Sequence, residues 1–186
     1  MGTYSFIAEF KGRVYLSCYQ CERSLDAFSN WVNDFISRSD ISKMQRKRII
    51  EDSLDNDLAP SPLEGLNGIW CWWINPWGKS LLLNFMETLE WDDDSAHTYT
   101  FIVLYEGGTY ISQHRGVDYD DSVRLWLEYF ITSPYLNDLD KENMLSSFAR
   151  CFTASIEVRS NFYNMHLLIC NKQLDLYIAK TKINET

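Results

Sequence analysis

The spacing of hydrophobic positions changes several times along the chain, and each change predicts a different element. β-Branched and aromatic residues dominate some short segments, whereas in others apolar residues recur every three or four positions. The first pattern predicts β-strands at 3–10, 13–19, 69–75, 79–89, 98–106, 109–114, 156–159, 165–170 and 174–178. The second pattern predicts helices that begin near residues 25, 43, 120 and 141.

Short polar residues mark the start of each predicted helix, because their side chains can accept a hydrogen bond from the free N–H groups of the first turn. The expected capping residues are Ser24, Ser42, Asp120 or Asp121, and Asp140. The second cap is strengthened by Gln45, which completes a capping box with the serine three residues before it.

The stretch 68–114 predicts an antiparallel meander. Asn75-Pro76-Trp77-Gly78 has the proline and glycine positions of a type I turn, and Gly107-Gly108 is typical of a two-residue hairpin turn. The strand at 99–106 is apolar on both faces, a pattern typical of a strand inside a covered sheet. We expect the helix that follows to supply this cover.

The order of the predicted elements is hairpin, two helices, meander, two helices, strands. This order segregates the element types and indicates an α+β fold, not a parallel βαβ fold. The length of 186 residues is usual for one domain, and inspection of the sequence finds no internal repeat. We therefore expect a single α+β domain over residues 1–186, with an antiparallel β-meander sheet covered by helices.

Five tryptophans gather in the central stretch. On an alternating strand Trp70 and Trp72 share one face while Trp73 lies on the other, so they cannot all enter one core. Two interpretations follow: both faces of the sheet are covered, or an aromatic patch is exposed. An exposed patch would mark a binding site.

The chain is acidic, with a formal net charge of −9 and a sequence pI near 4.8. This charge repels nucleic acid and anionic membranes, so we expect no direct nucleic-acid ligand and no membrane ligand, and we favour a basic partner. The plainer interpretation is that acidity keeps a soluble protein dispersed. A basic run at residues 43–48 is more typical of a solvated helix face than of a phosphate site.

The compartment is predicted from what the sequence lacks. No apolar run approaches the roughly 20 residues of a membrane-spanning helix, and the N-terminal segment has no secretion-signal pattern. Five cysteines, an odd number, argue against a secreted disulfide framework. We therefore expect a cytoplasmic protein with reduced thiols.

Candidate chemistry is sparse. Cys18 and Cys21 have the spacing of half a zinc site or of a dithiol redox motif, or they are small residues at the edge of a core. The glycines match neither a dinucleotide fingerprint nor a P-loop. We expect no cofactor, no bound metal, no catalytic residues and no enzymatic activity. The alternative is a metal- or thiol-dependent enzyme with a carboxylate-rich site.

Two segments combine clustered negative charge with an aromatic residue. The expected partner-binding residues are Trp91, Asp92, Asp93, Asp94, Asp118, Tyr119, Asp120 and Asp121. Charge of this kind steers a basic protein to the surface, and aromatic anchors supply affinity. The other interpretation is that the first cluster is a solvated loop and the second a helix cap.

The Trp-rich segment 68–78, Gly-Ile-Trp-Cys-Trp-Trp-Ile-Asn-Pro-Trp-Gly, and the acidic segment after it belong to a compact acidic chain. In general character this chain resembles the bacterial immunity proteins of contact-dependent growth inhibition and related polymorphic toxin systems. The resemblance implies a non-enzymatic inhibitor that binds one cognate toxin domain, often a nuclease, and blocks its active site or substrate surface. The alternative to the enzyme and immunity hypotheses is a ligand-binding domain with an aromatic pocket.

Overall fold

The computed structural model describes residues 1–88, 97–134, 136–151, 156–159 and 162–181. The chain has an α+β fold in which helices cover antiparallel sheet. It divides into two compact units, which we call unit 1 (residues 1–89 with 182–186) and unit 2 (residues 90–181). The prediction of one domain over 1–186 stays a prediction beside this division. In the described part of the chain no helix is long and apolar enough to span a membrane.

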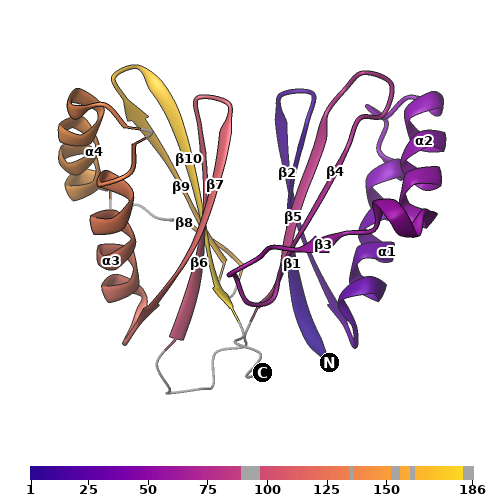
Figure 1. Ribbon diagram of the computed structural model, residues 1–186, viewed down its shortest axis with the longest axis horizontal. Coiled ribbons are helices and arrows are strands. Elements are labelled where there is room, and N and C mark those ends of the chain that lie inside the picture. The colour runs from indigo at the N-terminus through magenta and orange to yellow at the C-terminus, as the bar shows by residue number, and fades with distance from the viewer. Residues whose placement is uncertain (89–96, 135, 152–155, 160–161, 182–186) are drawn as a thin grey trace. The chain divides into compact units, whose positions relative to one another are not determined.

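Unit 1 is a five-stranded antiparallel sheet with both helices on one face (Figure 1). Its elements are β1 (Gly2–Phe10), β2 (Arg13–Cys21), α1 (Ser24–Ser37), α2 (Lys43–Leu54), the 3₁₀ turn η1 (Asn56–Leu58), β3 (Ser61–Pro62), β4 (Ile69–Ile74) and β5 (Leu81–Thr88). The strands lie in the order β2-β1-β5-β4-β3.

Unit 2 is built in the same way, again with its helices on one face of the sheet (Figure 1). Its elements are β6 (His97–Tyr105), β7 (Gly108–Gly116), α3 (Tyr119–Ile131), α4 (Asp138–Cys151), β8 (Ile156–Arg159), β9 (Phe162–Ile169) and β10 (Lys172–Thr181). The strands lie in the order β7-β6-β10-β9-β8. Both units therefore share one topology.

The likeness extends to single positions. Since β1 begins at residue 2 and β6 at residue 97, equivalent residues lie 95 positions apart, and the two hairpins keep one register, Gly2↔Cys21 and His97↔Gly116. Identical pairs at this offset are Thr3/Thr98, Tyr4/Tyr99, Phe6/Phe101, Ile7/Ile102, Gly12/Gly107, Tyr15/Tyr110, Ser17/Ser112, Asp26/Asp121, Trp31/Trp126, Phe35/Phe130 and Ile36/Ile131. The structure thus contains an internal repeat that inspection of the sequence did not find.

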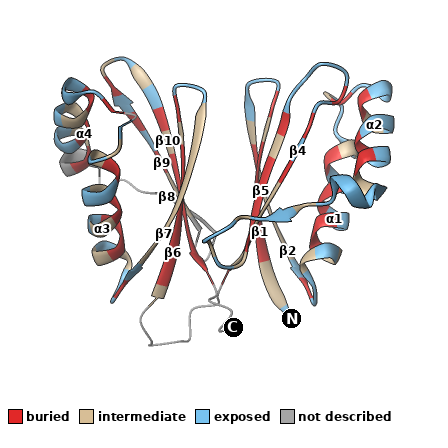
Figure 2. Ribbon diagram, viewed as in Figure 1, coloured by how far each residue is buried: buried red, intermediate tan, exposed pale blue. Residues whose placement is uncertain are grey.

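The two cores are assembled from the same ring contacts. Phe6 stacks on Trp31 with ring centroids 6.2 Å apart, and the equivalent Phe101 stacks on Trp126 at 5.3 Å. Each tryptophan also stacks on a phenylalanine one helical turn further on. Figure 2 shows buried residues along the helix sides that face each sheet. These contacts fix the first helix of each unit over the first strand.

The predicted hairpins and helices are confirmed, but three caps are not. The strands of the stretch 68–114 form two separate hairpins instead of one continuous meander, since β5 pairs with β4 and β1, and β6 pairs with β7 and β10. The capping box of Ser42 and Gln45 is present as expected. Residue Arg23, not Ser24, precedes α1, and it makes no capping bond through its side chain. The cap of α3 is Asp118 instead of Asp120 or Asp121, because α3 already begins at Tyr119, four residues before Val123, the first position of its apolar stripe.

The fourth cap and two turns also differ from expectation. α4 begins at Asp138, so the predicted cap Asp140 lies inside the helix, where its N–H donates to Asn137 Oδ1. Trp77 has φ of +57°, which excludes a type I turn at 75–78. The hairpin turn after β6 is Glu106-Gly107, not Gly107-Gly108, since both of its residues have positive φ and Tyr105 pairs with Gly108.

Equivalent core positions should respond equally to truncation. Phe6→Ala and Phe101→Ala each remove a fully buried ring, so each variant should lose about 3–5 kcal/mol of unfolding free energy. Leu168→Ala, at an exposed position of β9, should change it by no more than about 0.5 kcal/mol. Urea unfolding followed by tryptophan fluorescence measures both, and a loss below about 1 kcal/mol at Phe101 would contradict the assigned core.

Candidate partner-binding surface

Half of the predicted acidic surface lies outside the described residues. Trp91, Asp92, Asp93 and Asp94 fall in the segment 89–96, so their part in binding stays a prediction. The second predicted cluster, at the start of α3, is described.

Two aspartates of this cluster hold the start of α3. Asp118 Oδ1 accepts the backbone N–H of Asp121 at 2.8 Å, and Asp121 Oδ2 accepts the backbone N–H of Val117 at 3.2 Å. The first of these bonds satisfies a free donor of the first turn, and the second ties the residue before the cap to the helix. Both carboxylates place negative charge at the positive end of the helix dipole. The helix-cap interpretation of the cluster is therefore confirmed for Asp118 and Asp121.

The contacts of Asp121 favour the ionised form of its side chain, and Asp118 is exposed. A hydrogen bond from Arg124, followed by that from the Val117 backbone, lowers the pKa of Asp121. Arg124 donates to Asp121 Oδ1 at 2.7 Å and to Glu128 Oε1 at 2.8 Å, so these charges form a ladder along α3. Asp120 is exposed beside it. The surface of α3 is thus acidic and held in one geometry.

The aromatic residue of the cluster is only half exposed. The Tyr119 ring lies 5.9 Å from that of Tyr99 and 4.5 Å from that of Tyr163, so part of its surface already packs within unit 2. Tyr129, ten residues later on the same helix, is 58% exposed. We did not single out Tyr129 from the sequence, because it falls outside both the apolar stripe and the acidic runs.

The charge of the chain is concentrated in unit 2. Residues 90–181 contain 14 acidic and 7 basic residues, a net charge of −7, whereas residues 1–89 contain 11 and 9, a net charge of −2. The basic run of α2 is largely engaged within unit 1. Arg48 pairs with Asp52 at 2.8 Å, and Arg46 donates to the carbonyls of Ile41 and Arg38.

The central tryptophans divide as the strand alternation predicts. Trp72 is buried in the core and Trp70 packs against it, so these two follow the core interpretation. Trp73 and Trp77 are each 62% exposed, so these two do not enter the core. Their indole N–H groups donate to Ser80 Oγ and to the Met44 carbonyl, which fixes both rings on unit 1.

Both cysteines of the Cys-x-x-Cys motif lie on one strand, which holds their side chains apart. Cys18 and Cys21 are three residues apart on β2, so their side chains project from opposite faces, roughly 10 Å apart along the strand. Cys18 Sγ lies 3.3 Å from Ser5 Oγ, and Cys21 Sγ accepts from Asn30 Nδ2 at 3.3 Å. Within the described residues no group of three His, Cys, Asp or Glu side chains could hold a metal ion.

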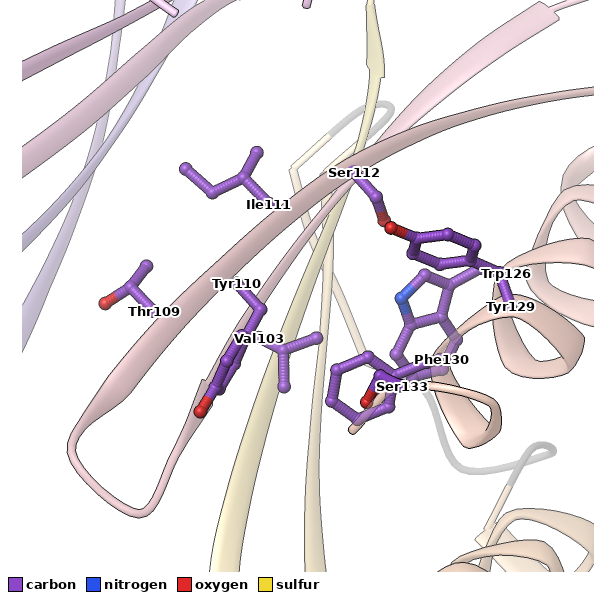
Figure 3. Close-up of a pocket in the computed structure, with 9 residues that line it drawn as sticks. All are labelled: Val103, Thr109, Tyr110, Ile111, Ser112, Trp126, Tyr129, Phe130 and Ser133. Atoms are coloured by element: carbon purple, nitrogen blue, oxygen red, sulfur yellow. The ribbon is translucent and has the colours of Figure 1, made fainter. Parts of the chain in front are cut away.

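A pocket of about 260 Å³ lies between β7 and α3 of unit 2 (Figure 3). The lining residues are Val103, Thr109, Tyr110, Ile111, Ser112, Trp126, Tyr129, Phe130 and Ser133. The sequence analysis assigned Trp126 and Phe130 to the core and did not connect them with β7. Trp126 and Phe130 are identical to Trp31 and Phe35, which lie 95 positions earlier and face β2. This repeat is the sequence signal that could have placed them next to β7.

Comparison with known protein families, curated proteins and solved structures finds no match to this chain.

Because Cys18 and Cys21 project from opposite faces of β2, we can predict whether they form a disulfide. Mild oxidation of the folded protein should produce no Cys18–Cys21 disulfide, because a disulfide needs Cα atoms within about 7 Å. In 8 M urea the same oxidant should join them. Peptide mapping by mass spectrometry separates the two cases, with Cys21→Ser as the control. Rapid formation of the disulfide without denaturant would contradict the assigned strand.

Proposed function

We propose that the protein binds and neutralises a basic partner protein, in the manner of the immunity proteins that it resembles in character, with unit 2 as the contacting unit. The partner would be a toxin domain, and a nuclease is the most natural case because its phosphate-binding cleft attracts carboxylates. Binding would block the active site or the substrate surface of the toxin.

The main support for the proposal is that the two units have the same topology but different net charges. The cores of the two units share residues at equivalent positions, so folding alone does not require a net charge of −7 in one and −2 in the other. A surface that draws in a positively charged partner does require such a difference, because clustered charge raises the rate of encounter.

The fixed geometry at the start of α3 supports the same proposal. Asp118 and Asp121 are held by backbone N–H groups, so little conformational freedom is lost when a partner binds them. Val117 and Tyr129 are exposed on either side of the acidic ladder and offer apolar contact area. Tight protein–protein interfaces combine apolar anchor residues with charged residues.

The thiol-enzyme alternative has less support. Burial raises the pKa of Cys71, and burial together with Asp140 raises the pKa of Cys170. A raised pKa lowers the fraction of thiolate, which is the nucleophilic form. A catalytic thiol needs the opposite shift.

The proposed surface is tested by a variant in which the aspartates at the start of α3 lose their charge but keep their shape. The partner is first captured on the tagged protein from a lysate of its own source and shown to be toxic when it is expressed alone. The triple variant Asp118→Asn, Asp120→Asn, Asp121→Asn keeps the cap, since Asn caps helices as well as Asp. Its association rate with that partner should fall roughly ten- to hundredfold in low salt.

The matched control removes the same three charges from unit 1. Glu22→Gln, Asp57→Asn and Glu64→Gln lie at exposed positions, and this variant should bind within about threefold of the parent. Stopped-flow association at two salt concentrations measures both variants, and rising salt should weaken the parent more than the unit 2 variant. Equal losses in the two variants would show that net charge, not the surface of α3, governs binding. Capture of no toxic basic protein would contradict the proposal itself.

A further inference from the structure

The pocket of unit 2 has a counterpart in unit 1 that is almost closed. At the offset of 95, seven lining residues of the unit 2 pocket correspond to residues that line a cavity of about 60 Å³ between β2 and α1. These pairs are Tyr15/Tyr110, Leu16/Ile111, Ser17/Ser112, Trp31/Trp126, Asp34/Tyr129, Phe35/Phe130 and Arg38/Ser133. The site of unit 1 is therefore much smaller than the equivalent site of unit 2.

Two of these pairs differ in size and charge, and the exchange of arginine for serine is the one that removes volume. In unit 1 the Arg38 guanidinium lies 4.4 Å from the centroid of the Tyr15 ring, and Asp34 Oδ2 accepts the hydroxyl of Tyr19 at 2.8 Å. In unit 2 the position of the long arginine is taken by Ser133, and that of the aspartate by Tyr129. The short serine leaves the space between strand and helix empty.

Two polar atoms in the walls of the open pocket have no hydrogen-bond partner among the described residues. They are Trp126 Nε1 and Ser133 Oγ, and both are buried. Trp126 is 0% exposed, and Figure 3 shows its indole nitrogen directed towards β7, into the space between strand and helix. Buried N–H donors are nearly always satisfied in proteins, so an unsatisfied donor beside an empty space points to an absent acceptor.

We propose that this pocket binds a small, planar, uncharged molecule that carries a hydrogen-bond acceptor, which the Trp126 indole N–H contacts. The lining residues carry no formal charge, so an ionic ligand would lack a counter-charge. Four aromatic side chains form the walls and favour a flat ring system. The volume lies just below the usual range of ligand pockets, about 300–1,000 Å³, so the ligand is small.

The surroundings of the pocket agree with a neutral ligand. The ring of His114 lies 5.2 Å from that of Tyr129, and burial lowers the pKa of this histidine, so it is neutral at pH 7. Ser133 Oγ can donate or accept, and it would contact a second polar atom of the ligand. Tyr129, at the exposed side, is able to cover a bound ring by a change of rotamer.

Two small molecules of similar shape, one with a hydrogen-bond acceptor and one without, show whether binding depends on the hydrogen bond or only on filling the pocket with an apolar ring. 1-Indanone is flat, neutral and has a carbonyl acceptor, whereas indane has the same rings without it. In ¹H–¹⁵N spectra of the full chain, 1-indanone should move the assigned indole signal of Trp126 downfield in a saturable way, with a dissociation constant below about 1 mM. Indane should bind roughly tenfold more weakly.

Variants that copy the closed site of unit 1 complete the test. Ser133→Arg should abolish the effect of 1-indanone on Trp126, and Ser133→Met gives a second, uncharged filling should the arginine variant not fold. Ser146→Arg, the same exchange on an exposed position of α4, should bind 1-indanone like the parent. The proposal is overturned if the Trp126 signal does not saturate, if indane binds as tightly as 1-indanone, or if filling the pocket leaves binding unchanged.

Discussion

The stacked pair of a strand phenylalanine and a helix tryptophan is the contact on which each unit depends. Phe6 on Trp31 and Phe101 on Trp126 join the first strand to the first helix, and both pairs are nearly parallel, with interplanar angles of 7° and 2°. Because large rings bury much apolar area in a fixed geometry, they set which side of the helix faces the sheet. The acidic start of α3 and the pocket beside β7 are consequences of this placement.

The two units share their core positions and differ outside them. Positions that build the core are identical or similar at the offset of 95, whereas those at its edge have diverged in size and charge. Unit 1 uses Arg38 over Tyr15 to close the gap between helix and strand, and unit 2 leaves the same gap open at Ser133. Function on a shared fold resides in such non-core positions. The higher negative charge of unit 2 belongs to the same divergence.

The sequence predicted what depends on local period and missed what depends on pairing at a distance. The hairpins, the helices and the Ser42 capping box were readable, because each is encoded within a few neighbouring residues. The split of Trp72 and Trp73 between core and surface followed from strand alternation. The cap of α3 was missed by two residues, since α3 begins four residues before its apolar stripe, and periodicity does not mark that point. The pocket was missed because it joins β7 to α3.

We propose that unit 2 recognises the partner, whereas the shared core positions of both units serve folding. Hydrogen exchange of the full chain, with and without the toxic partner captured from its own source, tests this claim most directly, because α1 serves as an internal control for α3. The partner should slow exchange at residues 117–131 and leave the equivalent residues 22–36 unchanged. Protection at 22–36, with 117–131 unaffected, would contradict it.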